Sequence, residues 1–260
     1  MRSGRAPWDR HRASRGFLRR MSRPWRSGSA ETRGRRMDDR QTFRDALKYC
    51  AFPVDEEAVT RCFRYADLIR DWNTRINLVS RCDAPRILSR HVFDSLCLVF
   101  AVRIEGGRRV LDLGSGAGFP GIPMALVRED LNLLLVESKR KKAFFLRKAV
   151  DELSLVNSAV CGERIETLAG SPPAVDLVVS RAVADLTTLI RWAQPLFQGR
   201  PGRLLAVKGP EAEEEIVRVR TSCPGVASHS VTPLYPRVYG EVRRDSRVID
   251  IRFRSIDQND

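Results

Sequence analysis

The chain has 260 residues and is 43% hydrophobic, which suffices for one large α/β domain with a full core or for two small domains. It has no run of the roughly 18 to 20 apolar residues that a membrane-spanning helix needs, no apolar signal-peptide core, and cysteines and histidines too scattered for a zinc site. We therefore expect a soluble, cytoplasmic protein with one main domain and no metal centre. The net charge of +14 favours a nucleic-acid partner, although this charge is unevenly placed.

Most of the excess charge lies in residues 1–36, which hold twelve arginines against Asp9 and Glu31. This segment has a net charge of +10 and leaves only +4 for residues 37–260. Its Arg, Ser, Gly and Pro content cannot build a core, so we predict a disordered basic extension. Three interpretations stay open: a start codon placed too early, with Met37 as the true start; a basic RNA-binding tail; or an organelle-targeting peptide.

Residues 37–105 show a helical pattern, clearest between Phe43 and Phe100. Apolar side chains recur every three to four residues, so that each expected helix has one apolar face. Residues 73–82 (NTRINLVSRC), between the last two helices, are polar and turn-like. We predict a helical cap in front of the main domain, with this turn segment available to line a site.

The pattern changes at residue 106, where the predicted main domain (106–260) begins. Five short apolar runs alternate with amphipathic stretches: residues 109–114, 131–137, 157–162, 175–181 and 203–209. Apolar strands separated by helices indicate a parallel sheet covered on both faces, with ligands bound at the carboxyl ends of the strands. The stretch from about Val226 to Phe253 is typical of an antiparallel hairpin that closes the sheet.

The first apolar run leads into LDLGSGAGFPGIP, residues 111–123, which places four glycines at a strand-to-helix turn. Glycine lets the backbone approach a ligand closely, and the start of the next helix offers free N–H groups. A nucleotide-like cofactor is therefore expected. The spacing Gly116-x-Gly118-x-x-Gly121, with Glu137 nineteen residues after Gly118, also fits an NAD enzyme.

Two features favour S-adenosylmethionine over NAD. Asp112 within the strand and the spacing Gly114-x-Gly116-x-Gly118 are similar to methyltransferase loops, in which the acidic residue orients the glycine turn. Pro120 and Pro123 stiffen the helix start, where a dinucleotide needs N–H groups for its pyrophosphate. With either cofactor, Glu137 is expected to accept hydrogen bonds from ribose hydroxyls. An NAD enzyme would also need a hydride-transfer set that we cannot locate, and a noncatalytic RNA-binding or assembly factor would predict a broken loop, whereas this loop is intact.

Several short segments occur in a characteristic order: Asn77-Leu78, Arg90-His91, Asp94-Ser95-Leu96, Gly114 to Pro123, Glu137-Ser138, Lys141-Lys142, Phe145-Leu146, Gly162 to Glu166, Ser180-Arg181-Ala182 and Lys208-Gly209. In this combination the chain resembles the 16S ribosomal RNA guanine-N7 methyltransferase family, also known as glucose-inhibited division protein B. The resemblance covers about residues 40–215. Residues 1–36 match nothing in the family pattern, and the part after Pro210 matches loosely.

The resemblance implies the Rossmann-like fold of class I S-adenosylmethionine-dependent methyltransferases, with a seven-stranded, mostly parallel sheet. It implies transfer of a methyl group from S-adenosylmethionine to N7 of a guanine in 16S ribosomal RNA, expected to be guanine 527 in the 530 loop. The expected partner is this RNA, in the small ribosomal subunit or in an assembly intermediate. The enzyme is expected to act as a monomer.

The resemblance also assigns roles to single residues. The implied cofactor residues are Asp112, Gly114, Gly116, Gly118, Phe119, Glu137, Ile165, Glu166 and Arg181, with Ile165 and Glu166 beside the adenine. From the chemistry of guanine recognition we expect Arg181 or Lys208 to be catalytic, either of which would hold the base through O6 and leave N7 free. The implied RNA contacts are Asn77, His91, Asp94, Lys141 and Lys142. Phe119 and Ile165 could instead be core residues, Glu166 a solvated helix charge, and His91 a partly buried histidine bordering the site.

RNA contact is expected from basic residues near the strand ends and in the cap. The densest basic cluster in the body lies in residues 138–153, a stretch that must also bury Phe144 or Phe145 against the sheet. A solvated helix face is the alternative explanation of this cluster. Four arginines of the cap are equally suited to contact phosphates: Arg75, Arg81, Arg86 and Arg90.

Overall fold

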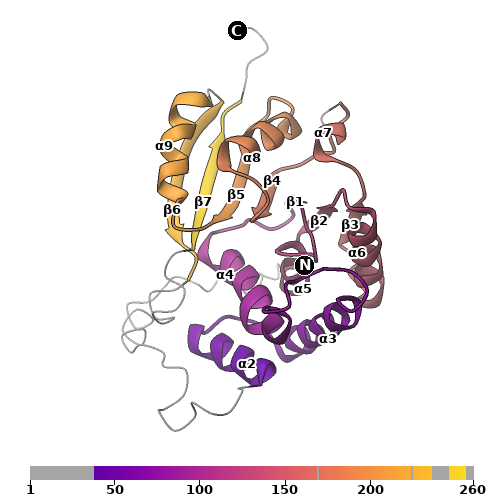
Figure 1. The fold of residues 1–260 in the computed structure, drawn as a ribbon. Helices are drawn as coiled ribbons and strands as arrows, with labels where there is room; N and C mark the ends of the chain where they lie inside the picture. Colours follow the sequence, from indigo (N-terminus) through magenta and orange to yellow (C-terminus); the bar gives the residue numbers. More distant parts are fainter. Residues whose placement is uncertain (1–37, 169, 224, 236–245, 256–260) are drawn as a thin grey trace, which may run out of the picture.

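The computed structural model describes residues 38–168, 170–223, 225–235 and 246–255 (Figure 1). The predicted basic extension, residues 1–36, and the alternative start Met37 lie outside the described residues. Within the described ranges, no helix combines the length and the apolar character needed to cross a membrane.

The first part of the described chain is helical, as predicted (Figure 1). Its elements are α2 (Asp39–Cys50), α3 (Glu56–Trp72), a 3-10 turn (Ala84–Arg86), a π-helical segment (Ile87–Val92) and α4 (Phe93–Ala101). The polar segment 73–82 forms turns and bends. The predicted turn segment between the cap helices is therefore confirmed.

Aspartates set the start of these helices. The side chains of Asp38 and Asp55 accept hydrogen bonds from N–H groups in the first turns of α2 and α3, donors that have no partner within the helix. The buried carboxylate of Asp39 reaches the π-helical segment, where it accepts the N–H groups of Leu88 and Ser89 at 3.0 and 2.9 Å. The widened turn before α4 is thus held from a neighbouring helix.

Seven strands form one sheet: β1 (Arg109–Leu113), β2 (Asn132–Val136), β3 (Ser158–Cys161), β4 (Leu177–Arg181), β5 (Gly202–Lys208), β6 (Val226–Pro233) and β7 (Arg247–Phe253). Their order is β3-β2-β1-β4-β5-β7-β6. Strands β1 to β5 are parallel, and β7 is antiparallel to both of its neighbours. The predicted mostly parallel sheet and its closing antiparallel hairpin are confirmed. The strand order reverses between β1 and β4, which is where ligand crevices form in such sheets.

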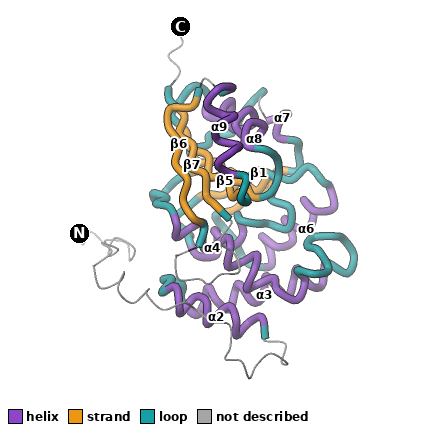
Figure 2. The backbone as a smooth tube through the Cα atoms, turned by 60° about the vertical axis from the view of Figure 1, so that its left-hand side comes forward, coloured by secondary structure: helices purple, strands orange, loops and turns teal. Residues whose placement is uncertain are grey.

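Helices cover both faces of the sheet (Figures 1 and 2). The cap helices share one face with α5 (Gly121–Val127) and α6 (Arg140–Glu152). The other face carries α7 (Ile165–Leu168), α8 (Leu186–Ala193), a 3-10 turn (Gln194–Phe197) and α9 (Ala212–Ser222). In Figure 2 the cap helices lie together on one side of the strands and α8 and α9 on the other.

Alternate residues of each strand face the two layers. In β4, Leu177 and Val179 pack in the core that includes the cap, whereas Val178 packs in the core that includes α8. By this alternation Arg181, the last residue of β4, faces the cap. Its partner in register on β5 is Val207, so Lys208, one residue later, faces the other layer. The two expected catalytic residues therefore point to opposite faces of the sheet.

Candidate cofactor and substrate site

The glycine-rich loop follows β1 at the carboxyl edge of the parallel strands. Gly114, Gly116 and Gly118 have φ angles of +74°, +61° and +101°, in a region that L side chains rarely adopt. A Cβ at Gly121 would clash with Leu135 and lie 2.7 Å from the Asp112 carboxylate. Three glycines thus turn the chain, and the fourth lets the following helix pack against β1 and β2.

Two carboxylates hold this loop. Asp112 of β1 is fully buried and accepts the N–H of Gly121 at 3.0 Å. Glu137 directly follows β2 and is 7% exposed; its Oε2 accepts the N–H of Gly116 at 3.0 Å, and its Oε1 accepts that of Lys139 at 2.7 Å. Because each carboxylate oxygen can accept more than one hydrogen bond, Glu137 keeps capacity for ribose hydroxyls.

The surroundings of the loop fit S-adenosylmethionine, which carries ribose hydroxyls and a cationic amino group. Burial is the main reason that the pKa of Asp112 is raised to about 7, while the hydrogen bond from Gly121 lowers it. Its other oxygen, Oδ1, is buried and has no hydrogen-bond partner among the described residues, a costly state that a bound ligand can relieve. A Cβ at Gly116 would meet only the Gly114 carbonyl oxygen, at 3.9 Å, so open space adjoins the loop.

The cap holds the same loop from its other side. Tyr65 in α3 is fully buried, and its hydroxyl donates to the Ala117 carbonyl at 2.6 Å. The Tyr65 ring lies 5.6 Å from the Phe119 ring, measured between centres. Helix α3 thus contacts both the backbone and a side chain of the loop. Helical periodicity marks such a tyrosine only as a core residue, so the sequence pattern gives it no role at the site.

Arg181 points into the junction between cap and sheet. Its guanidinium carbon lies 5.2 Å from the centre of the Phe119 ring. Its Nη1 is 3.3 Å from the His91 carbonyl oxygen and 3.7 Å from the Asp94 carboxylate, and its Nη2 contacts His91 Nδ1. The His91 ring is stacked on Phe119 at 5.1 Å. The fold thus brings together four of the residues singled out in the sequence.

Two further side chains, one from the turn before the π-helical stretch and one from beyond β6, contact this group. The hydroxyl of Tyr235, beyond β6, donates to Asp94 Oδ1 at 2.9 Å. The carboxylate of Asp83 lies 3.7 Å from His91 Nε2 and 3.0 Å from the guanidinium of Arg90. No motif marks Tyr235 or Asp83, and the contact between Tyr235 and Asp94 spans 141 positions. Nothing in the local sequence signals these contacts.

Lys208 does not join this group. Its ammonium donates to the Ala184 carbonyl and lies 2.9 Å from the Glu215 carboxylate of α9. The Lys208 side chain is 9% exposed. Its charge is therefore neutralised on the α9 side of the sheet, whereas Arg181 faces the cap.

The other expected site residues lie around the edge of this group. Ile165, at the start of α7, is buried in the core cluster that includes Leu113 and Val136 near the ends of β1 and β2. Glu166 is exposed. Of the expected RNA contacts outside the group, Asn77 and Lys141 are exposed and Lys142 is half-buried.

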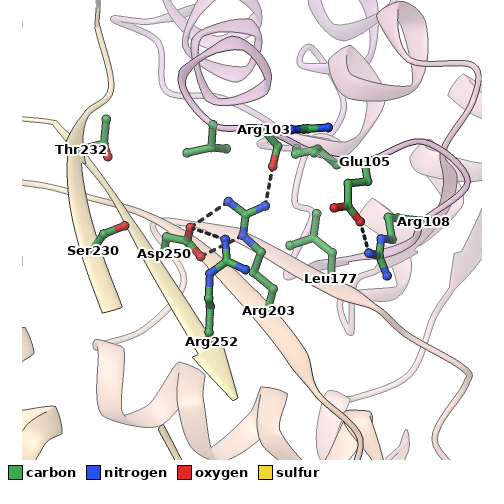
Figure 3. Close-up of a pocket in the computed structure, with 11 residues that line it drawn as sticks. Arg103, Glu105, Arg108, Leu177, Arg203, Ser230, Thr232, Asp250 and Arg252 are labelled. Atoms are coloured by element: carbon green, nitrogen blue, oxygen red, sulfur yellow. Dashed lines mark hydrogen bonds and ion pairs between the residues drawn. The ribbon is translucent and has the colours of Figure 1, made fainter. Parts of the chain in front are cut away.

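A cavity of about 320 Å³ lies at the opposite end of the sheet (Figure 3). Its walls come from the starts of β4 and β5, from β6, from the end of β7 and from residues 102–108. Arg203 forms two hydrogen bonds to the Asp250 carboxylate, both of 2.8 Å, and donates to the Arg103 carbonyl at 2.5 Å. These contacts join β5 and β7 to the segment between cap and sheet. None of the expected site residues lines this cavity.

Comparison with known families decides between the interpretations of the glycine loop. The family model described as GidB, rRNA small subunit methyltransferase G, matches residues 59–234. The chain belongs to this family. It is therefore an S-adenosylmethionine-dependent methyltransferase of small-subunit ribosomal RNA, and the NAD interpretation is set aside. The predicted family, fold class, enzyme class and cofactor are confirmed.

Individual relatives agree with the GidB assignment. The ribosomal RNA small subunit methyltransferase G of Gluconobacter oxydans is 40% identical over 180 residues, which cover 69% of this chain and 89% of that protein. The protein of the same name from Roseiflexus sp. (strain RS-1) is 39% identical over 172 residues, covering 65% and 73%. The crystal structure of M. jannaschii TYW2 in complex with AdoMet is alike in fold alone, with a TM-score of 0.51 at 14% identity over 70% of this chain and 80% of that chain.

Proposed function

We propose that this GidB family member methylates N7 of a guanine in 16S ribosomal RNA, expected to be guanine 527 in the 530 loop. The observation that carries the proposal is the position of Arg181, whose guanidinium lies over the Phe119 ring of the cofactor loop. Arginine most often recognises guanine through its O6/N7 edge. A contact to O6 alone would hold the base and leave N7 free to react.

Methylation at N7 requires the protein mainly to position the guanine base. N7 carries an in-plane lone pair and no proton, so neither a general base nor a covalent nucleophile is required. Bound S-adenosylmethionine supplies a methyl group on a positively charged sulfur. The protein has to hold the base in line with that methyl group, and such positioning is worth about 7 to 11 kcal/mol in well-oriented systems.

Different residues bind the cofactor and the target base. Asp112 orients the glycine turn through Gly121. We assign the ribose hydroxyls to Glu137, which also accepts the N–H of Gly116. We assign the adenine side to Ile165 and Glu166, and the first contact with the target base to Arg181. Because Lys208 is neutralised by Glu215 on the other face of the sheet, we assign it a supporting role at the end of β5.

The test is to map 7-methylguanine in 16S ribosomal RNA from cells that lack this gene. Reduction and aniline cleavage at 7-methylguanine, followed by primer extension, locate each modified position. We expect one site to be lost in the deletion strain and restored by the wild-type gene. Arg181→Ala should not restore it, because misplacement of a reacting group by about 1 Å can cost 100-fold in rate.

Arg103→Ala is the matched control for this experiment. Arg103 is exposed and borders the cavity at the opposite end of the sheet, so its replacement should restore the modification fully. Protein levels of both variants are compared by immunoblotting. A 7-methylguanine pattern that is the same with and without the gene would refute the guanine-N7 assignment.

We further propose that the enzyme acts in the cytoplasm as a monomer, on the small ribosomal subunit or an assembly intermediate. The support for this partner is the family match, whose description names small-subunit ribosomal RNA as the substrate. Sedimentation of the purified protein with and without small subunits tests the monomer and the partner together.

A further inference from the structure

Helix α6 carries an exposed aromatic ring with basic residues on the turns before and after it. Phe144 is 50% exposed, whereas its neighbour Phe145 is fully buried. Residues three and four positions apart lie on the same face of a helix. For Phe144 these positions are all basic and all exposed: Arg140, Lys141, Arg147 and Lys148.

The basic residues at the start of α6 have no acidic partner in the described part of the chain. Residues 138–150 contain six Lys or Arg and no Asp or Glu, and none of the six forms an ion pair with another described residue. In the cap, by contrast, three of the four arginines noted in the sequence form ion pairs: Arg75 with Asp71, and Arg86 and Arg90 with Asp83. Of the two basic regions noted in the sequence, α6 therefore offers the stronger attraction for phosphates.

A second ring widens this surface. Trp72, the last residue of α3, is half-buried, and its ring centre lies 5.7 Å from that of Phe144. The guanidinium of Arg75, itself 63% exposed, lies 5.6 Å from the Trp72 ring centre. Aromatic and basic groups are thus interleaved where the cap meets α6.

The surface begins beside the cofactor loop. Glu137 binds the N–H of Gly116 in the loop and that of Lys139, the residue before α6. Phe144 lies about one helical turn further along. A strand whose guanine is held at the carboxyl edge of the sheet can therefore continue across α6.

We propose that Arg140, Lys141, Phe144, Arg147 and Lys148, with Trp72 beside them, bind single-stranded RNA next to the target guanine, with an unpaired base stacked on Phe144. The inference rests on the proposed function and names the RNA surface of the same site. Stacking requires a free base face, which a paired strand does not offer, and it tolerates any base because each has a π face. The cations contact the adjoining phosphates.

The test uses purified full-length protein and 16S ribosomal RNA, free and in small subunits, from cells lacking the gene. Phe144→Ala should raise the Kd and KM for RNA by about 5- to 150-fold, the range expected for one base–aromatic stack. The kcat at saturating RNA and the Kd for S-adenosylmethionine should stay unchanged. Phe144→Trp, which keeps an aromatic face, should restore RNA binding.

Two further variants complete the design. Val217→Ala removes an exposed apolar side chain, 66% exposed, from α9 on the other face, and should leave the KM for RNA unchanged. The double variant Arg147→Ala/Lys148→Ala neutralises fewer phosphates of the bound strand. It should therefore reduce the slope of log Kd against log salt, by about 0.7 for each single-strand phosphate that no longer has a cation beside it.

The outcomes separate this inference from the proposed function. If the wild type methylates RNA but Phe144→Ala has a normal KM for RNA, the α6 surface is refuted and the proposed function stands. If Phe144→Ala loses S-adenosylmethionine affinity in step with RNA affinity, Phe144 is a structural residue and the inference also fails. If the wild type methylates no guanine N7, the proposed function itself is wrong.

Discussion

Gly114 and Gly107 share a backbone conformation but differ in surroundings. Their φ angles are +74° and +73°, yet a Cβ would lie 2.7 Å from Val183 at Gly114 and would meet nothing within 4 Å at Gly107. We expect either glycine-to-alanine change to cost about 1–2 kcal/mol of stability because of the left-handed backbone. Only Gly114→Ala should also distort the cofactor loop and weaken S-adenosylmethionine binding at least tenfold, as measured by calorimetry. Equal cofactor affinities in the two variants would contradict this.

Asp112 should make stability depend on pH. Its pKa in the folded protein is raised from 3.8 to about 7, so between these values the folded state keeps a proton that the unfolded state has lost. The free energy of unfolding therefore falls as pH rises, by up to about 1.4 kcal/mol per pH unit, and levels off above about pH 7. Asp112→Asn cannot titrate. The difference between wild type and variant in urea unfolding without cofactor should follow this course, and a flat difference would refute it.

Among the elements, α3 fixes the cofactor loop through Tyr65. Tyr65→Phe keeps the ring against Phe119 but removes the hydrogen bond to the buried Ala117 carbonyl, at a cost of about 1–3 kcal/mol. We expect lower stability in urea unfolding and weaker S-adenosylmethionine binding. Tyr235→Phe is the matched control, since it removes a hydroxyl bound to Asp94 instead; it should raise the KM for RNA more than the Kd for the cofactor. The same pattern in both variants would contradict these separate roles.

Apolar spacing does not predict that the segment Ile87–Val92 is π-helical rather than α-helical. Apolar spacing predicts helix through this stretch, and helix is present. The widened turn is stabilised from outside the segment, because the Asp39 carboxylate of α2 accepts hydrogen bonds from two of its N–H groups. The segment contains Arg90 and His91, so this distant carboxylate also sets where two site residues lie.

The whole molecule should unfold as one unit, since a single core cluster includes residues of α2, α3, α4 and the sheet. Two tryptophans lie in the described ranges, Trp72 in α3 on the cap face and Trp192 in α8 on the other. Variants that keep one of these, with every other tryptophan changed to Phe, should give the same urea midpoint by fluorescence. Separate midpoints would show that residues 37–105 and 106–260 are independent domains.

The strands, the cap helices and the glycine loop can be predicted from the amino-acid sequence, because they depend on side-chain periodicity and on backbone freedom within a few residues. The likeness to methyltransferase loops predicts that Asp112 orients the glycine turn, and its carboxylate accepts the N–H of Gly121. The order of the motifs predicts the family, and with it the cofactor and the class of enzyme.

Which residues share the site depends on how distant parts of the chain pack together. Arg181 and Lys208 both end apolar strands, but a one-residue offset in register turns a side chain to the opposite face of a sheet, so only Arg181 faces the cap. Tyr65 and Tyr235 join the site across 52 and 141 positions. Such contacts depend on how the cap and the final hairpin pack against the sheet. The residues on either side of each tyrosine do not predict that packing.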